Sequence, residues 1–226
     1  MPEERSPRQV IPLHPDFFCD GHYYVLTSVS LGGSDMPLGA IADILGYGQE
    51  AGIRDLLERG ICLPLCFEGD CALDGKTLFV LGDLTAQEEN DWIARLVWKL
   101  KVPCGKLLIL CGGGDEGDWI DATSGNPPKP TYRIFQVMEV PPGEYQVEVY
   151  AYLASMTVQV SLSEYDQHWN LIEHEALRQW YEDHRPGDPE VGYIIRLTPL
   201  EAAPPFPELL PEISWCGNFE FRQPEL

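Results

Sequence analysis

The sequence predicts an α+β fold, with predominantly antiparallel, β-sandwich-like sheets and about four short helices. Apolar residues alternate with other residues over positions 145–153, which is the period-two pattern of a half-buried strand. Short connections separate many of the predicted strands, and strands joined in this way usually pair antiparallel. The predicted helices are spaced too irregularly along the chain for a series of parallel βαβ units, so the α+β class is favoured.

The strand at residues 145–153 is the centre of the predicted sheet. One face of this strand carries Tyr145, Val147, Val149, Ala151 and Leu153. The other face carries Glu144, Gln146, Glu148, Tyr150 and Tyr152. The preceding Pro141-Pro142-Gly143 is a turn sequence, so we expect residues 133–140 to pair with this strand as a hairpin. The alternation resumes over residues 156–162, which predicts a second hairpin.

The remaining elements follow the chain order. Residues 1–16 contain four prolines among charged residues, which predicts an extended or partly disordered N-terminal arm, and residues 17–226 are expected to form a single α+β domain. Further strands are predicted at residues 22–31, 61–67, 77–81, 106–111, 192–197 and 213–221. Helices are predicted by apolar residues at helical spacing over residues 37–45, 49–59, 87–97 and 171–182.

Residues 93–102 fit two patterns. A helical pattern begins at a capping box formed by Thr85 and Glu88 and continues through Val97. From Trp98 the apolar residues alternate with lysines, as they do in a strand. We favour a helix over residues 87–97.

The composition limits the classes of partner. An apolar fraction of 44% indicates a packed globule, and a net charge of −21 argues against nucleic acid and anionic membranes, because both would be repelled. A basic protein or a cation remains open as a partner. No apolar run approaches the ~20 residues of a membrane span, and no secretory signal is recognised. With seven cysteines, these features lead us to expect a cytoplasmic, bacterial-type protein with reduced thiols.

The segment from Gly112 to Asp121 is rich in glycine and acids. It contains a Gly-x-Gly-x-x-Gly match after a predicted strand, but its acids would repel a pyrophosphate, so we expect no nucleotide site there. Asp115, Asp118 and Asp121 offer carboxylate ligands for a hard cation, although their spacing is not that of an EF-hand loop. We favour a solvated acidic loop without a cofactor. The alternative is a metal-dependent hydrolase or a ligand-binding sandwich with its site on this loop.

The cysteines give one further hint. Cys62 and Cys66 would stand about 13 Å apart on a strand, which is too far for a shared zinc ion. Cys104 lies between Lys101 and Lys106, and is the one thiol whose sequence neighbours favour a lowered pKa. No Gly-x-Ser-x-Gly motif for a serine nucleophile is present in the sequence.

The polar face of the central strand is the candidate binding surface. Tyr150 and Tyr152 share this face with Glu144 and Glu148, and tyrosines beside carboxylates suit the recognition of a basic protein. This reading requires the face to be exposed. If a helix covers it instead, the two tyrosines belong to the core.

The segment VPPGEYQVEVYAYL, in which a turn leads into a tyrosine-bearing strand, resembles segments of competence-type nuclease inhibitors and of small bacterial immunity proteins. The resemblance covers about fourteen residues. It implies a protein that neutralises a toxin or a nuclease, with carboxylates in the place of phosphates. We therefore predict a non-enzymatic acidic binding protein, inhibitor- or immunity-like, that recognises a basic protein; its oligomeric state is left open.

Overall fold

The computed structural model describes residues 8–112, 116–129, 132–165 and 170–222. The strands of the described residues are β1 Gln9–Pro12, β2 Tyr23–Ser28, β3 Cys62–Cys66, β4 Thr77–Leu81, β5 Ala94–Val102, β6 Lys106–Cys111, β7 Phe135–Glu139, β8 Gly143–Ala151, β9 Ser163–Tyr165, β10 Leu171–Glu173, β11 Tyr193–Pro199 and β12 Glu220–Phe221. The helices are α1 Leu38–Gly46, α2 Glu50–Glu58, α3 Ala86–Asp91, α4 Glu116–Ser124, α5 Met156–Ser161 and α6 Glu175–His184, with a 3-10 turn at Leu31–Gly33.

Two sheets and a small hairpin make up the β structure. The larger sheet has the strand order β1-β4-β11-β8-β5-β12, and the smaller sheet has the order β3-β2-β6-β7. Every pairing in the two sheets is antiparallel except that of β11 with β4, and β9 pairs with β10 separately. The predicted α+β class with predominantly antiparallel sheets is therefore confirmed.

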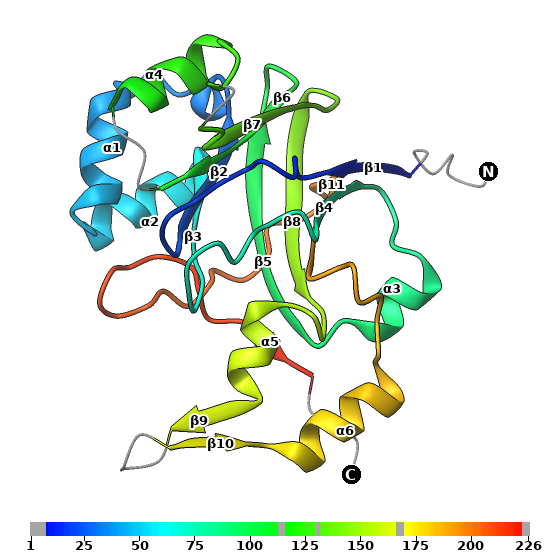
Figure 1. Cartoon of the computed structure of the whole chain (residues 1–226). Helices are drawn as coiled ribbons and strands as arrows, with labels where there is room; N and C mark the ends of the chain where they lie inside the picture. The colour runs from blue at the N-terminus through cyan, green and yellow to red at the C-terminus, as the bar shows by residue number, and fades with distance from the viewer. Residues whose placement is uncertain (1–7, 113–115, 130–131, 166–169, 223–226) are drawn as a thin grey trace.

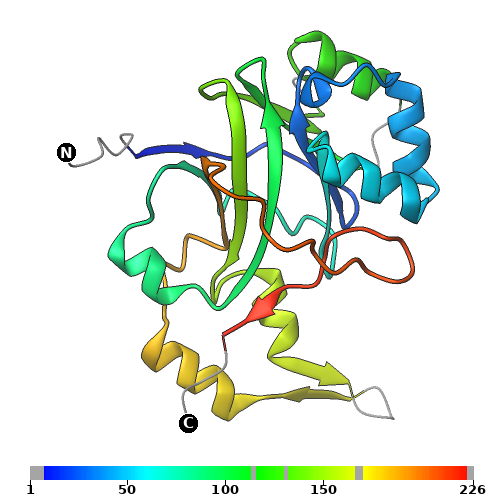
Figure 2. The ribbon, with the colours of Figure 1, turned by 180° about the vertical axis from the view of Figure 1, so that it is seen from behind.

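The hydrophobic core lies between the two sheets. It joins residues of the smaller sheet, such as Val25 and Leu108, to residues of the larger sheet, such as Val149 and Leu197. In Figure 1, α1, α2 and α4 gather beside the smaller sheet, and α3 and α6 lie at the other end of the molecule. Figure 2 shows the same separation from behind. The two ends of the molecule are therefore bordered by different helices.

The central strand is β8, as the alternation predicted. β8 pairs with β5 along its whole length and with β11 from Tyr145 onward. Tyr145, Val147 and Val149 point into the main core, while Tyr150 and Tyr152 point to the opposite face of the same sheet. Within the arm expected at residues 1–16, Gln9–Pro12 forms β1 and pairs with β4.

The predicted hairpin before β8 is wrong. β7 pairs with β6 in the smaller sheet, whereas β8 belongs to the larger one, so the Pro141-Pro142 segment carries the chain from one sheet to the other. β3 and β4 are also close in sequence and lie in different sheets. Burial of apolar residues between two sheets decided these pairings, which chain proximity alone does not predict.

The favoured helix over residues 87–97 is also wrong in its second half. α3 ends at Asp91, and β5 begins at Ala94. The strand alternates buried and half-buried residues throughout, because one of its faces lies on the core. The alternation seen from Trp98 onward thus extends back to Ala94. The capping box of Thr85 and Glu88 is present as predicted.

Two segments expected to be non-helical form helices. Residues 156–162 were expected as a strand, but α5 begins there because the Ser155 hydroxyl accepts a hydrogen bond from the backbone N–H of Val158. The acidic segment after Gly112 forms α4, in which Trp119 and Ala122 are buried.

The predicted boundaries near the C-terminus also need correction. The segment 171–173 is strand β10, so α6 starts later than expected, at Glu175. In the predicted strand 213–221, only Glu220–Phe221 belongs to a sheet.

Candidate functional site

The tyrosine face of β8 is covered by other parts of the chain. Tyr150 and Tyr152 are each 2% exposed, and they form a second small core with Trp92, Val80 and Ile194. The Tyr152 hydroxyl donates to the backbone oxygen of Glu88 in α3 (3.0 Å), and burial raises the pKa of Tyr150 to about 12. Of the two arrangements that the sequence left open, the structure has the one in which these tyrosines are core.

The two glutamates of this face are paired within the protein. Glu148 is 4% exposed and forms ion pairs with Arg196 (3.1 Å) and Arg95 (3.8 Å). Glu144 is exposed and lies opposite Lys101 in the β5–β8 register, with its carboxylate 3.3 Å from the lysine Nζ. Glu148 is thus a structural carboxylate of the sheet, and Glu144 is already paired with a cation.

The two candidate metal residues that the structure describes, Asp118 and Asp121, each have a partner within the protein. Asp118 is buried on α4 and pairs with Lys129 (3.5 Å), and Asp121 accepts a hydrogen bond from the Asn126 side chain (3.1 Å). Asp115 lies outside the described residues. Within the described ranges, no group of three or more His, Cys, Asp or Glu side chains is placed to hold a metal ion.

Cys104 has the lowered pKa that its sequence suggested, but for a different reason. Burial opposes the shift, and hydrogen bonds with the Ser30 side chain and with backbone groups outweigh it. The side chain is exposed on the turn between β5 and β6. The seven cysteines, all of which lie in the described residues, form no disulfide.

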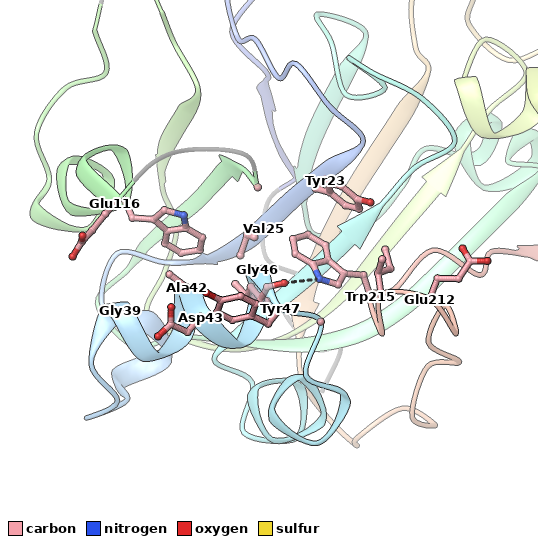
Figure 3. Close-up of a pocket in the computed structure, with 15 residues that line it drawn as sticks. Tyr23, Val25, Gly39, Ala42, Asp43, Gly46, Tyr47, Glu116, Glu212 and Trp215 are labelled. Atoms are coloured by element: carbon pink, nitrogen blue, oxygen red, sulfur yellow. Dashed lines mark hydrogen bonds between the residues drawn. The ribbon is translucent and has the colours of Figure 1, made fainter.

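A pocket of about 770 Å³ opens beside the smaller sheet. Figure 3 shows that it is built from distant parts of the chain, which include β2, α1, the start of α4 and a segment near the C-terminus. Its volume lies within the range of about 300–1,000 Å³ that is typical of ligand sites. It is therefore the candidate functional site.

α1 supplies one wall of the pocket. Its positions 39, 42, 43 and 46 follow helical spacing and line the cavity with Gly39, Ala42, Asp43 and Gly46. Ile41 and Leu45 of the same helix are buried in the core, and Leu45 also borders the pocket. Because the side chains on the cavity face are small, the helix leaves open space in front of Asp43.

The indole of Trp215 forms the floor of the pocket, packed against Tyr23 of β2 and Gly112 at the end of β6. Trp215 contacts the ring of Tyr23 (centroids 5.2 Å apart), and its Nε1 donates to the backbone oxygen of Leu45 (3.3 Å). A Cβ atom at Gly112 would lie 3.0 Å from Trp215 and 2.8 Å from the Tyr23 Cβ, so only glycine allows this packing. The floor is apolar and closely packed.

A turn near the C-terminus holds Trp215 in place. The backbone N–H of Leu210 donates to Trp215 (2.8 Å), and Cys216 exchanges backbone hydrogen bonds with β3 at Pro64 and Cys66. This turn also carries Glu212 to the pocket, opposite α4, where Glu116 and Trp119 share one helix face. Three carboxylates, those of Asp43, Glu116 and Glu212, thus line the pocket from three separate elements.

The electrostatics of the pocket are those of an unpaired anionic site. Among the described residues, the carboxylates of Asp43, Glu116 and Glu212 form no salt bridge, and no lysine, arginine or histidine lines the cavity. Elsewhere many exposed acids pair with a base, as Glu50 does with Arg54. A cationic ligand could therefore pair with carboxylates that have no salt-bridge partner among the described residues.

Sequence reasoning missed this pocket. Its walls come from segments more than 150 residues apart, Gly39 and Trp215 among them, and only the folded chain brings them together. One local signal was available: the small and acidic residues at positions 39, 42, 43 and 46 form a stripe opposite the apolar face of the predicted helix.

No protein-family model and no curated protein match the chain. Among solved structures, a protein described as crocagin biosynthetic gene J is similar with a TM-score of 0.36 and 14% identity, over 85% of this chain and 95% of that one. ComJ from Bacillus subtilis, an inhibitor of the DNA-degrading activity of NucA, is similar with a TM-score of 0.33 and 10% identity, over 87% of this chain and 98% of ComJ.

In the described residues, none of the helices has the length and apolar character that crossing a bilayer requires.

Proposed function

We propose that the protein is a non-enzymatic, inhibitor- or immunity-like binding protein that takes a basic segment of a partner protein into the pocket between α1, α4 and the C-terminal turn. One observation carries the proposal: within the described residues, three unpaired carboxylates line one cavity that contains no base. The net charge of −21 would add long-range attraction for a basic partner and would speed its approach.

The spread of the carboxylates favours a protein segment over a small cation. In Figure 3, Glu116 and Glu212 stand at opposite sides of the pocket, and Asp43 lies on α1. A single small cation would reach only part of this arrangement, whereas an extended segment with several basic residues would meet all three carboxylates. The aromatic and apolar floor would then accept the stems of those residues.

Calorimetric titration with a short, end-blocked peptide that alternates arginine and lysine with glycine tests the proposal. Salt of about 0.15 M screens the attraction by distant charges. The variant Asp43→Asn, Glu116→Gln, Glu212→Gln should lower the affinity at least about tenfold, because it removes three charge-assisted contacts.

The matched control is the variant Glu58→Gln, Glu139→Gln, Glu182→Gln. It changes the net charge equally at three exposed acids that form no salt bridge in the described part of the chain, and it should bind the peptide about as well as the unmodified protein. Equal weakening by both variants would mean that only bulk charge acts. Equal affinity for the peptide and for free arginine amide would indicate a small-molecule site instead.

A further inference from the structure

Tyr47 is an exposed ring at the rim of the pocket. It is 79% exposed, the highest value among the large hydrophobic side chains that the structure describes as exposed. It follows the last residue of α1 and stands between Gly46 and Gly48, so its chain neighbours have no side chains to cover it. A largely uncovered aromatic ring beside a cavity is a typical anchor for a binding partner.

Asp43 lies one helical turn before Tyr47. The backbone N–H of Tyr47 donates to the backbone oxygen of Asp43 (3.0 Å), so the two side chains follow the i and i+4 spacing of one helix face. Figure 3 shows both side chains at the same edge of the pocket. A carboxylate and a ring face are therefore presented together, and Asp43 has no ion-pair partner in the described residues.

The neighbouring glycines leave room for a long side chain. A Cβ atom at Gly39 or at Gly46 would meet no heavy atom within 4 Å. Glycine in a helix costs about 1 kcal/mol relative to alanine, so helix stability does not explain these residues. Their effect in the structure is open space in the pocket along α1, before and after Asp43.

We propose that this edge of the pocket selects arginine, with the guanidinium stacked on Tyr47 and hydrogen-bonded to the carboxylate of Asp43. The inference rests on the proposed function, and it specifies which basic residue the pocket prefers. A guanidinium is planar, stacks on aromatic faces and forms two parallel hydrogen bonds with a carboxylate. An ammonium group is more strongly hydrated and would lose more hydration beside Val25, Ala42 and Trp215.

Two end-blocked peptides that differ only in arginine or lysine at each basic position test this selectivity. The arginine peptide should bind about tenfold more tightly. Tyr47→Ala should remove most of that preference, while Tyr47→Phe should keep it, because the ring face and not the hydroxyl makes the contact. Circular dichroism of both variants checks that the overall secondary structure is unchanged.

The outcomes separate the two proposals. Equal affinity for the arginine and lysine peptides, with binding still lost in the Asp43, Glu116 and Glu212 variant, would overturn the selection of arginine and leave the basic partner in place. No pocket-dependent binding of either peptide would overturn both. Loss of the preference in Tyr47→Phe as well as in Tyr47→Ala would overturn the stacking contact.

Discussion

Trp215 and Gly112 meet at the floor of the pocket, where a Cβ atom on Gly112 would lie 3.0 Å from the Cη2 atom of the indole. The same atom would lie 2.8 Å from the Cβ of Tyr23, so neither neighbour leaves space for a methyl group. The pair joins the end of β6 to the turn that carries Glu212. The floor of the pocket therefore depends on the close approach of Gly112 to Tyr23 and Trp215.

Gly112→Ala should destabilise the protein by about 1–3 kcal/mol, because Tyr23 and Trp215 must shift to admit the methyl group. It should also weaken peptide binding, since Trp215 forms the floor. Urea unfolding gives the free-energy change, and calorimetry gives the affinity. Gly39→Ala is the matched control for the unfolding measurement alone, because its methyl group enters open space and should raise stability by up to about 1 kcal/mol. An unchanged free energy of unfolding in Gly112→Ala would contradict the packing described.

Arg196→Met should destabilise the protein by about 2–4 kcal/mol, because it leaves the more distant Arg95 as the base paired with the buried carboxylate of Glu148 and also breaks the bonds of Arg196 to Gly82 and Asp83. Lys101→Met is the comparison, since it breaks the exposed pair with Glu144 and should cost less than about 1 kcal/mol. Urea denaturation of both variants measures the difference. Equal destabilisation would show that Glu148 does not depend on Arg196.

Stability at high pH should depend on Tyr150. Its pKa in the folded protein is raised by burial to about 12 from an ordinary value of 10.0, so the folded state favours the neutral phenol. A raised pKa contributes stability that is complete below the unfolded value and is lost as the pH rises through the folded value. The free energy of unfolding should therefore fall as the pH rises from about 10 to about 12, and less steeply in Tyr150→Phe. Identical slopes in the two proteins would contradict the burial of this phenol.

Thr85→Ala should destabilise the protein by about 1 kcal/mol, because the Thr85 side chain accepts a hydrogen bond from the Glu88 backbone at the start of α3. Thr85→Ser retains a hydroxyl and should behave like the unmodified protein. Thermal unfolding of the two variants is the measurement. A similar loss in both would assign the effect to the threonine methyl group and not to the cap.

Local sequence patterns predicted the elements well where a single periodicity was present. The alternation at Tyr145 to Ala151 and the capping box at Thr85 both occur as expected, because each depends on residues close in sequence. α5 was missed because Val158 and Val160 also fit a strand, and the Ser155 cap decides for a helix. The burial of Tyr150 was not predictable locally, because it depends on Trp92, which tertiary packing places beside it.

The candidate site could not be predicted from local sequence patterns either, because it also depends on tertiary packing. The charge of the chain directed attention to carboxylates, but Glu144 and Glu148, the acids of the predicted binding face, pair with bases across strands. The three unpaired acids are binding candidates because α1, α4 and the C-terminal turn place them around one cavity. Identifying that cavity required the fold.

Amide chemical-shift mapping during titration with the peptide that alternates arginine and lysine with glycine tests whether the pocket is the binding site. The largest changes should fall on α1 and the two residues after it, from Gly39 to Gly48, on Glu116 and Trp119 of α4, and on the turn from Glu212 to Trp215. The β9–β10 hairpin, on a distant part of the molecule in Figure 1, should be unaffected. Changes spread evenly over the acidic surface, or concentrated on the hairpin, would contradict the assignment of the pocket as the binding site.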